Sequence, residues 1–429
     1  MASSPQGLVT RQRQLQATQQ AAWIQLGADI YGEAECDEFG QSLTLSSDGT
    51  VLAVGAYFND GNGSESGHVR VFKYADSQWT QLGADLDGEA AGDFFGSSAS
   101  LLSDGTVLAV GASNGSNVKS GYVRVYQFAD NAWTQLGTDI DGEAASDRFG
   151  DSVTLSSDGT VLAVGAPTND GNGPDSGHVR VYEFANNAWT QMGVDIDGEA
   201  GGTKVSPGDF FGASISLSSD GTVLAVGAPH NDGNRGHVRI YKYANSQWSQ
   251  RGATIYGDAA CDMSGLSVSL SSDGSVLAVG AMNNDGNGSN SGHVRVYQFD
   301  NNAWTQLGTD IDGEAADDTS GTSVDLSSDG TVLAVGAKDN DGNGSNSGHV
   351  RVYKYTNNIW TQWGPDIDGI AAYDNFGQNL SLSSDGTVLA VGAPSNDGNG
   401  GTGWNNGHVR VYQQSTTETP PSALSLKLP

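Results

Sequence analysis

A dodecapeptide close to LSSDGTVLAVGA occurs seven times in this chain of 429 residues, first at Leu45–Ala56 and last at Leu382–Ala393. The aspartate of its Ser-Asp-Gly turn stands at Asp48, Asp104, Asp158, Asp220, Asp273, Asp329 and Asp385. A period of roughly 55 residues, filled with short strands and turn residues, is typical of the blades of a β-propeller. The sequence therefore predicts an all-β fold, a seven-bladed β-propeller.

The repeat at residues 149–196 shows how one blade is built. A first strand ends at the Asp158-Gly159 turn, a pair that favours a tight hairpin. The β-branched, nearly continuous apolar run Thr160–Ala166 is typical of a strand buried on both faces. After a Gly/Asn/Asp loop, His178–Phe184 alternates as a third strand, and Trp189–Val194 follows as a fourth. We therefore expect four antiparallel strands per blade.

The two ends of the chain complement each other. The last repeat stops after His408–Gln413, without a tryptophan strand, whereas an isolated one, Trp23–Gly27, precedes the first repeat. We expect this N-terminal strand to complete blade 7 and to close the ring, which removes an open sheet edge. The predicted domain is a propeller over residues 23–414. Residues 1–22 and 415–429 are expected to be disordered tails, since both are polar.

Composition limits the possible partners. With 50 acidic and 19 basic residues the formal net charge is −31. Nucleic acids and anionic membranes bind through basic patches, so neither is expected as a direct partner. No apolar run reaches the ~18 residues of a membrane-spanning helix, and we expect no membrane insertion. The charge favours cations, basic surfaces or neutral glycans, or it serves solubility alone.

The repeats resemble FG-GAP repeats, the blades of the integrin α-subunit head. The Phe-Gly pair occurs at Phe39-Gly40, Phe95-Gly96, Phe149-Gly150, Phe211-Gly212 and Phe376-Gly377, and it is replaced by Ser264-Gly265 and Ser320-Gly321. Gly-Ala-Pro is complete at Gly165–Pro167, Gly227–Pro229 and Gly392–Pro394. The resemblance covers about residues 23–414 and implies the propeller fold and an adhesion-like binding role.

One departure from this family concerns calcium. The family often carries an Asp-x-Asp-x-Asp-Gly loop between its Phe-Gly and Gly-Ala-Pro strands. Here that place holds the Ser-Asp-Gly turn with a single carboxylate, whereas calcium takes several oxygen ligands. The family's calcium sites are therefore not expected at these positions.

The acidic residues gather in two kinds of long loop, those between strands 2 and 3 and those that link one blade to the next. In a propeller these two kinds of loop share one rim, and the tight turns share the other. The long loops hold most of the 50 acidic residues and few of the 19 basic ones, so the net charge is expected on one face. Such a face attracts cations and basic partners.

A repeated linker motif, Asp-x-Asp-Gly-Glu-x-x-x-Asp, places carboxylates at its positions 1, 3, 5 and 9. Alternate side chains of a curled loop can converge on a hard cation, so the motif predicts calcium ligands. The alternative is a solvated linker whose aspartates cap turns. The complete copies are Asp85, Asp87, Glu89 and Asp93; Asp139, Asp141, Glu143 and Asp147; and Asp310, Asp312, Glu314 and Asp318.

Two residues outside the repeat pattern are candidate ligand contacts on the acidic rim. Trp404 lies in the long Asn/Gly loop of blade 7, where an aromatic side chain could meet a sugar ring or a peptide, or pack beneath the loop. His230 is the one histidine that does not begin a third strand. The other six histidines occur once per blade and are expected to be structural.

Three functions are compatible with the sequence. We expect a non-enzymatic, adhesion-like scaffold whose acidic rim binds a protein or glycan partner, with calcium as a possible cofactor. The alternatives are a glycan-active enzyme with its site in the central depression of that rim, and a structural shell or matrix component. The sequence contains no catalytic constellation, so no catalytic residue is predicted, and it does not indicate the oligomeric state.

An extracellular or cell-surface location is expected from the family resemblance. Residues 1–22 contain no apolar segment of a signal peptide. Five Asn-x-Ser sequons, acceptors for N-glycosylation, are compatible with secretion and suggest a glycoprotein. They are Asn62, Asn114, Asn287, Asn343 and Asn379.

Overall fold

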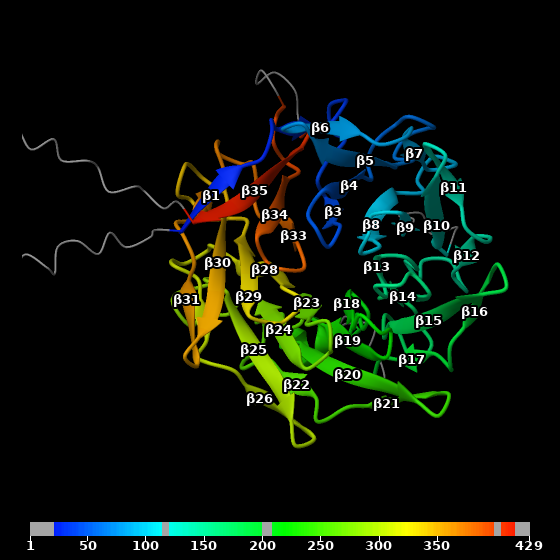
Figure 1. The fold of residues 1–429 in the computed structure, drawn as a ribbon. Helices are drawn as coiled ribbons and strands as arrows, with labels where there is room; N and C mark the ends of the chain where they lie inside the picture. Colours follow the sequence, from blue (N-terminus) through cyan, green and yellow to red (C-terminus); the bar gives the residue numbers. More distant parts are fainter. Residues whose placement is uncertain (1–20, 114–119, 200–207, 399–404, 417–429) are drawn as a thin grey trace, which may run out of the picture.

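Each repeat forms one antiparallel sheet, and seven such sheets surround a central axis in the computed structural model (Figure 1). The structure describes residues 21–113, 120–199, 208–398 and 405–416. The first strand of each blade lies next to the axis. These inner strands are β3 (Ser42–Leu45), β8 (Phe95–Leu101), β13 (Ser152–Leu155), β18 (Ser214–Leu217), β23 (Ser267–Leu270), β28 (Ser320–Leu326) and β33 (Asn379–Leu382).

The second strands carry the apolar Val-Leu-Ala-Val-Gly-Ala segment and are buried along their whole length. They are β4 (Val51–Ala56), β9 (Val107–Ala112), β14 (Val161–Ala166), β19 (Val223–Ala228), β24 (Val276–Ala281), β29 (Val332–Ala337) and β34 (Val388–Ala393). The third strands follow a long loop. They are β5 (His68–Ala75), β10 (Tyr122–Ala129), β15 (His178–Ala185), β20 (His237–Ala244), β25 (His293–Asp300), β30 (His349–Thr356) and β35 (His408–Thr416).

The fourth strands form the outer edge of each blade. They are β6 (Gln78–Gln81), β11 (Ala132–Gln135), β16 (Ala188–Gln191), β21 (Gln247–Gln250), β26 (Ala303–Gln306), β31 (Ile359–Gln362) and β1 (Ala21–Gln25). After each, two residues rejoin the third strand. These short pairings are β7 (Leu86–Asp87), β12 (Ile140–Asp141), β17 (Ile196–Asp197), β22 (Ile255–Tyr256), β27 (Ile311–Asp312), β32 (Ile367–Asp368) and β2 (Ile30–Tyr31). One short helix, α1 (Asn231–Asn234), lies in the loop of blade 4.

The N-terminal strand closes the ring, as the sequence predicts. β1 pairs antiparallel with β35, with Trp23 opposite Gln414. The indole Nε1 of Trp23 donates to the carbonyl oxygen of Trp363 in blade 6, at 3.0 Å. In each of the other six blades the fourth-strand tryptophan makes the same bond to the blade before it. These tryptophans therefore join neighbouring blades.

The hydrophobic core lies between the blades rather than inside any one of them. Each cluster of buried residues combines side chains of two neighbouring blades; Val123 of blade 2, for example, shares a cluster with Leu162 and Val164 of blade 3. Full burial of a Val or Leu side chain stabilises the fold by about 1.5–3 kcal/mol. No blade buries its faces alone, so the ring must fold as a unit.

The Phe-Gly pair serves this blade-to-blade contact. The five phenylalanines of the pair are completely buried. A Cβ on Gly55, in the second strand of blade 1, would lie 2.2 Å from the carbonyl oxygen of Gly96 in blade 2. Glycine is therefore required where the blades approach most closely.

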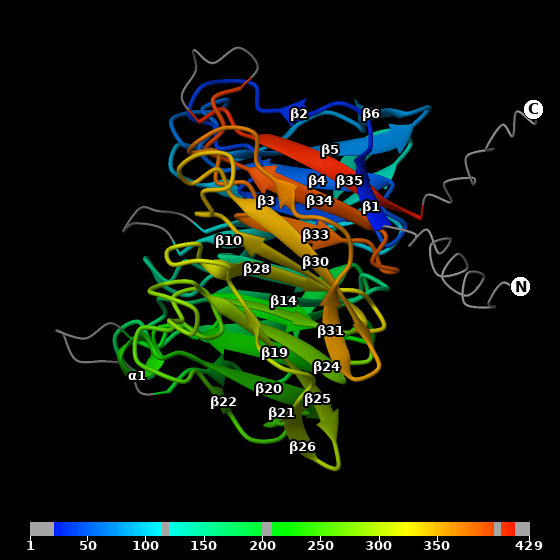
Figure 2. The ribbon, with the colours of Figure 1, turned by 90° about the vertical axis from the view of Figure 1, so that its left-hand side faces the viewer.

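The two kinds of long loop share one rim. The amide of Phe95, at the end of the linker from blade 1, donates to the carbonyl oxygen of Ser66 in the loop between β4 and β5. The side view shows α1 at the edge of this rim, on the left of the molecule (Figure 2). On the opposite rim, hydrogen bonds link the tight turns of neighbouring blades. The backbone amide of Ser384 in blade 7, for example, donates to the carbonyl oxygen of Ser47 in blade 1. Among the described residues no helix is long and apolar enough to cross a membrane.

Candidate functional site

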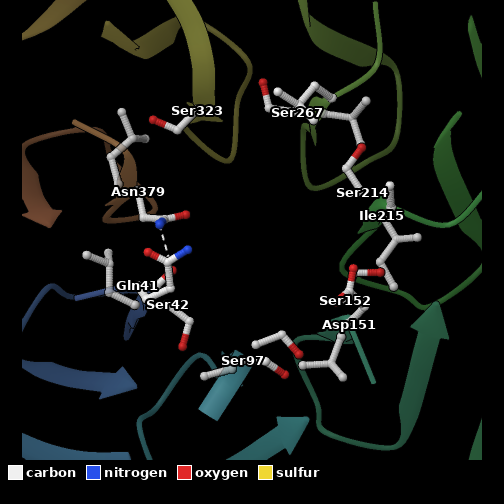
Figure 3. Close-up of a pocket in the computed structure, with 18 of the residues that line it drawn as sticks. Gln41, Ser42, Ser97, Asp151, Ser152, Ser214, Ile215, Ser267, Ser323 and Asn379 are labelled. Atoms are coloured by element: carbon white, nitrogen blue, oxygen red, sulfur yellow. Dashed lines mark hydrogen bonds between the residues drawn. The ribbon is translucent and has the colours of Figure 1, made fainter. Parts of the chain in front are cut away.

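An axial channel runs between the seven inner strands and holds a hollow of about 280 Å³ (Figure 3). Six serine hydroxyls and one amide surround it. Each donates to a backbone carbonyl oxygen of the next blade at 2.6–2.8 Å, so the ring of polar groups also binds the blades together. These residues are Ser42, Ser98, Ser152, Ser214, Ser267, Ser323 and Asn379.

The residues at one end of this channel vary between the seven repeats. The strands repeat almost unchanged, but the positions on either side of the Phe-Gly pair, and the two after Gly-Ala, vary in charge, size and polarity. We call these positions the channel mouth. The position before the pair is Glu38, Phe94, Arg148, Phe210, Met263, Thr319 or Asn375, and the position after it is Gln41, Ser97, Asp151, Ala213, Leu266, Thr322 or Gln378.

In blades 1 to 3 the mouth residues enclose a pocket of about 290 Å³ that opens beside the channel. Blade 1 contributes Gln41, Tyr57 and Phe58, blade 2 contributes Phe94, Ser97 and Ser113, and blade 3 contributes Arg148 and Asp151. Gln41, Ser97 and Asp151 also line the channel, so the two hollows adjoin. We call this hollow the aromatic pocket.

Three aromatic rings form one wall of the aromatic pocket. Tyr57 and Phe58 lie with centroids 4.1 Å apart, and Phe94 meets both nearly at right angles, at 5.7 and 5.6 Å. All three side chains remain partly exposed. The Tyr57 hydroxyl lies 3.3 Å from Oε2 of Glu38, and burial together with this carboxylate raises the pKa of Tyr57. Tyr57 therefore stays a neutral hydrogen-bond donor.

The facing wall is polar. A guanidinium N–H of Arg148 donates to Oδ1 of Asp151 at 2.6 Å. The Arg148 side chain is 49% exposed and that of Asp151 is 18% exposed, so the pair faces the opening. Burial raises the pKa of Asp151, and Arg148 opposes that shift. The pocket thus combines an apolar wall with a paired anion and cation.

The mouth residues of the other blades also contact one another. In blade 4 the ring of His230 packs edge-on against Phe210 at 4.5 Å, and its Nδ1 lies 2.8 Å from Oδ1 of Asn234. In blade 6 Thr319 donates to Asp339 at 3.0 Å. The predicted ligand contact His230 therefore lies at the channel mouth, whereas Trp404 lies outside the described residues.

Sequence reasoning missed the aromatic pocket, although a signal for it exists. Tyr57, Phe58 and Phe94 stand at positions that vary between the repeats, although Phe210 of blade 4 matches Phe94. Where an element is copied seven times, the positions that differ are those that the fold does not dictate. Aligning the repeats with each other and noting the variable columns would have selected them.

The linker carboxylates predicted as calcium ligands lie on the same rim but turn toward different partners. In the linker that follows blade 2, Asp139 accepts two bonds from Arg124 of its own blade, at 2.8 and 2.7 Å. Glu143 pairs with Arg180 of the next blade. Asp147 is buried and accepts from Asn169 at 2.8 Å. Asp141 is exposed, and its carboxylate has no hydrogen-bond or ion-pair partner among the described residues.

The two other complete linkers follow the same plan. Glu89 pairs with Arg124 and Glu314 with Arg351, each across a blade boundary. Asp93 and Asp318 accept backbone amides of their own turns. Of the remaining motif residues, Asp85 accepts a hydrogen bond from Gln81, and Asp310 accepts one from Arg295. Asp87 and Asp312 each lie in a two-residue strand.

The rim arginines therefore form a belt of ion pairs between blades. Pairing with Arg124 holds the pKa of Asp139 below its usual range. Arg295 lowers the pKa of Asp310 in the same way. Among the described residues, four groups of one histidine and two acidic residues lie along this belt, for example Glu143, His178 and Asp195. Within each group the possible ligand atoms lie within 4.8 Å of one another. Arg180 already pairs with both acids of that group, so a cation there would compete with the guanidinium.

The comparisons with known proteins agree with this architecture. The family model described as FG-GAP repeat matches residues 32–72 and 138–182, which contain the pairs Phe39-Gly40 and Phe149-Gly150. These two segments match the FG-GAP repeat. Together with the seven-bladed ring, these FG-GAP repeats are consistent with a propeller like that of the integrin α-subunit. The search of curated proteins found no match.

One solved structure similar to this chain is a crystal structure from Bacteroides uniformis, described as a candidate 6-phosphogluconolactonase. It aligns with a TM-score of 0.53 and 14% sequence identity, over 77% of this chain and 86% of that chain. At this identity the likeness concerns the fold alone.

Proposed function

We propose that the protein is a non-enzymatic binding module that uses the channel mouth on its acidic rim to hold a protein or glycan partner. The observation that carries this proposal is the gathering of the variable repeat positions around one opening. The fold needs none of these side chains to differ, yet they combine aromatic, cationic, anionic and amide groups there. Concave sites with apolar walls and a few polar groups are the usual binding sites of proteins.

The charge of the rim supports a partner that is neutral or basic. The net charge of −31 repels polyanions, and the linkers that carry much of it surround the mouth. A phosphorylated sugar, the kind of compound named in the description of the Bacteroides uniformis protein, would enter against this field. The guanidinium at the pocket, Arg148, is already paired with Asp151.

Two further parts of the proposal concern calcium and location. Calcium would neutralise exposed linker carboxylates such as Asp87, Asp141 and Asp312, which the arginine belt leaves unpaired. The match to FG-GAP repeats, which are typical of extracellular proteins, supports an extracellular or cell-surface location.

Blocking the mouth tests the proposal. The variant Ser97→Trp, Thr322→Trp places large side chains on two widely separated inner strands, whereas Gln127→Trp changes an exposed position of β10 and serves as control. Each protein is applied to a glycan array and a peptide array. We expect ligands that bind the wild type and the control but not the blocked variant. A wild type that binds nothing, or binding that survives both tryptophans, contradicts the proposal.

A further inference from the structure

We infer that the aromatic pocket takes one pyranose ring of an uncharged saccharide, an inference that rests on the proposed binding function of the channel mouth. It is carried by the arrangement of the three rings, by the polar groups opposite them, and by the local charge. Each of these features distinguishes a sugar from the other ligands that an acidic rim could attract.

The rings form a platform rather than a cage. Their centroids lie 4.1, 5.7 and 5.6 Å apart, so each ring is in contact with the other two. A cation held by aromatic rings lies over their faces, within about 6 Å of each centroid. Rings that already touch leave no space between them for an ammonium or guanidinium group. The three residues are partly exposed, and the face of an aromatic ring carries a negative potential that attracts the weakly positive C–H groups of a sugar.

The opposite wall supplies directional hydrogen bonds. Arg148 uses one N–H group for Asp151, and its planar guanidinium has further donors. The carboxylate of Asp151 retains acceptor capacity. The amide of Gln41 accepts from Gln378 at 2.8 Å, and its own N–H groups have no partner among the described residues. Donors and acceptors at fixed positions, facing an apolar platform, match the hydroxyl edge and the C–H face of a pyranose.

The charge within the pocket excludes the two charged classes of ligand. The side chains of Arg148 and Asp151 neutralise each other, so the pocket has no excess charge of its own. Glu38, beside Tyr57, and the acidic linkers around the mouth disfavour uronic acids and sugar phosphates. A cation would have to displace the Arg148 guanidinium from Asp151. The volume of about 290 Å³ is at the lower end for small-ligand pockets, which favours a single ring.

Saturation-transfer difference NMR on the whole protein tests this inference with a defined panel of methyl pyranosides. Irradiating the aromatic protons should transfer saturation to the C–H groups of one sugar face. The replacement Phe94→Leu keeps apolar volume but removes a ring, and Phe58→Leu does the same if the first variant is unstable. Phe184→Leu, at a partly exposed position of β15 outside the channel mouth, is the control. We expect at least a tenfold loss of affinity for the pocket variants and none for the control.

Charged probes complete the test. Glucose 6-phosphate should bind more weakly than the corresponding neutral sugar, and tetramethylammonium should not compete with the sugar. The inference is overturned by transfer to none of the neutral sugars, by equal affinity in the pocket variants, or by tighter binding of either charged probe. If peptides bind and blocking the mouth abolishes that binding while no sugar binds, the saccharide inference fails and the proposed function stands.

Discussion

Asp325 places a carboxyl group in the inner strand β28. At this position of the inner strands the other blades have a serine or a threonine. In five of them the hydroxyl oxygen accepts from a leucine amide of the next blade. Asp325 makes the same bond, from Leu382 at 2.8 Å, with a carboxylate oxygen. Burial raises the pKa of Asp325 to about 6, although Leu382, Ser269 and Leu326 all donate to it.

A raised carboxyl pKa makes stability fall as the pH rises. Between pH 4 and 6 the folded protein retains a proton on Asp325 that the unfolded chain has lost, so folding becomes less favourable over that interval. We expect Asp325→Ser to raise the melting temperature at pH 7.5 relative to the wild type and to change it little at pH 4. Melting curves from pH 4 to 8 measure this difference, and parallel curves for the two proteins would refute it.

The buried histidines act in the opposite direction and are common to both proteins. Burial lowers the pKa of His68, His237 and His408 to about 4. Below pH 6.5 these histidines become protonated in the unfolded chain but stay neutral in the folded protein. Acid therefore destabilises the fold between pH 6.5 and 4. Both the wild type and the Asp325→Ser variant contain these histidines, so the difference between their melting curves does not include the histidine effect.

Single residues also explain part of the sequon pattern. The amides of Asn62, Asn287 and Asn343 each donate to a glycine carbonyl oxygen in the linker from their own blade to the next, at 2.8–2.9 Å. Asn172 makes the same bond in blade 3, where proline follows the glycine and no sequon exists. This asparagine is therefore required by the loop. Glycosylation of the sequons stays a prediction.

At the scale of elements, β1 covers the edge of blade 7 where the two ends of the chain meet. It supplies the outer edge of blade 7, pairing along five residues with β35, and Trp23 reaches Trp363 of blade 6. The ring is also closed elsewhere, since Ser384 donates to Ser47 and Asn379 donates to the carbonyl oxygen of Gln41. β1 therefore protects an edge and reinforces a closure that the inner strands already make.

Deleting residues 1–27 should destabilise the ring and expose the edge of β35. Loss of a well-packed tryptophan alone costs about 3–5 kcal/mol, and an unpaired edge invites association between molecules. We expect a lower midpoint in denaturant and oligomers in size-exclusion chromatography. Deleting residues 1–20 is the control and should change neither. A 28–429 chain that is monomeric and as stable as the wild type would contradict the role given to β1.

The sequence is sufficient to predict the elements but not the site. Strand order, blade number and ring closure follow from the period and from the complementary ends, because those features depend on local pattern. The fourth-strand tryptophans, which join neighbouring blades, recur once in every blade, and this repetition indicates a structural role. The meeting of Tyr57, Phe58 and Phe94 does not, since two loops of different blades must be placed side by side. The sequence also does not reveal that Glu143 pairs with Arg180 instead of converging with Asp139 and Asp147 on one cation. That pairing depends on how the linker crosses between blades.

For the whole molecule, the net charge of −31 predicts a response to divalent cations. A cation that binds only the folded state stabilises it by about 2.7 kcal/mol at one hundred times its Kd. We expect millimolar calcium to raise the melting temperature more than sodium chloride at equal ionic strength. The replacement of Asp87, Asp141 and Asp312 by asparagine should reduce that gain without breaking an ion pair.

Glu143→Gln serves as the contrast, because it removes the partner of Arg180 and should lower stability with or without calcium. Equal shifts in sodium and calcium would mean that the rim responds only to screening.

The central claim is that the channel mouth of blades 1 to 3 is the ligand site of this propeller. A crystal structure of the protein soaked with its tightest-binding methyl pyranoside tests it most directly. A second hollow, of about 430 Å³, lies beside Arg70 and Trp79 and offers an independent location. The account predicts sugar density against Phe58 and Phe94, with hydroxyls at Arg148 and Asp151. Density only beside Trp79, or only on the opposite rim, would contradict it.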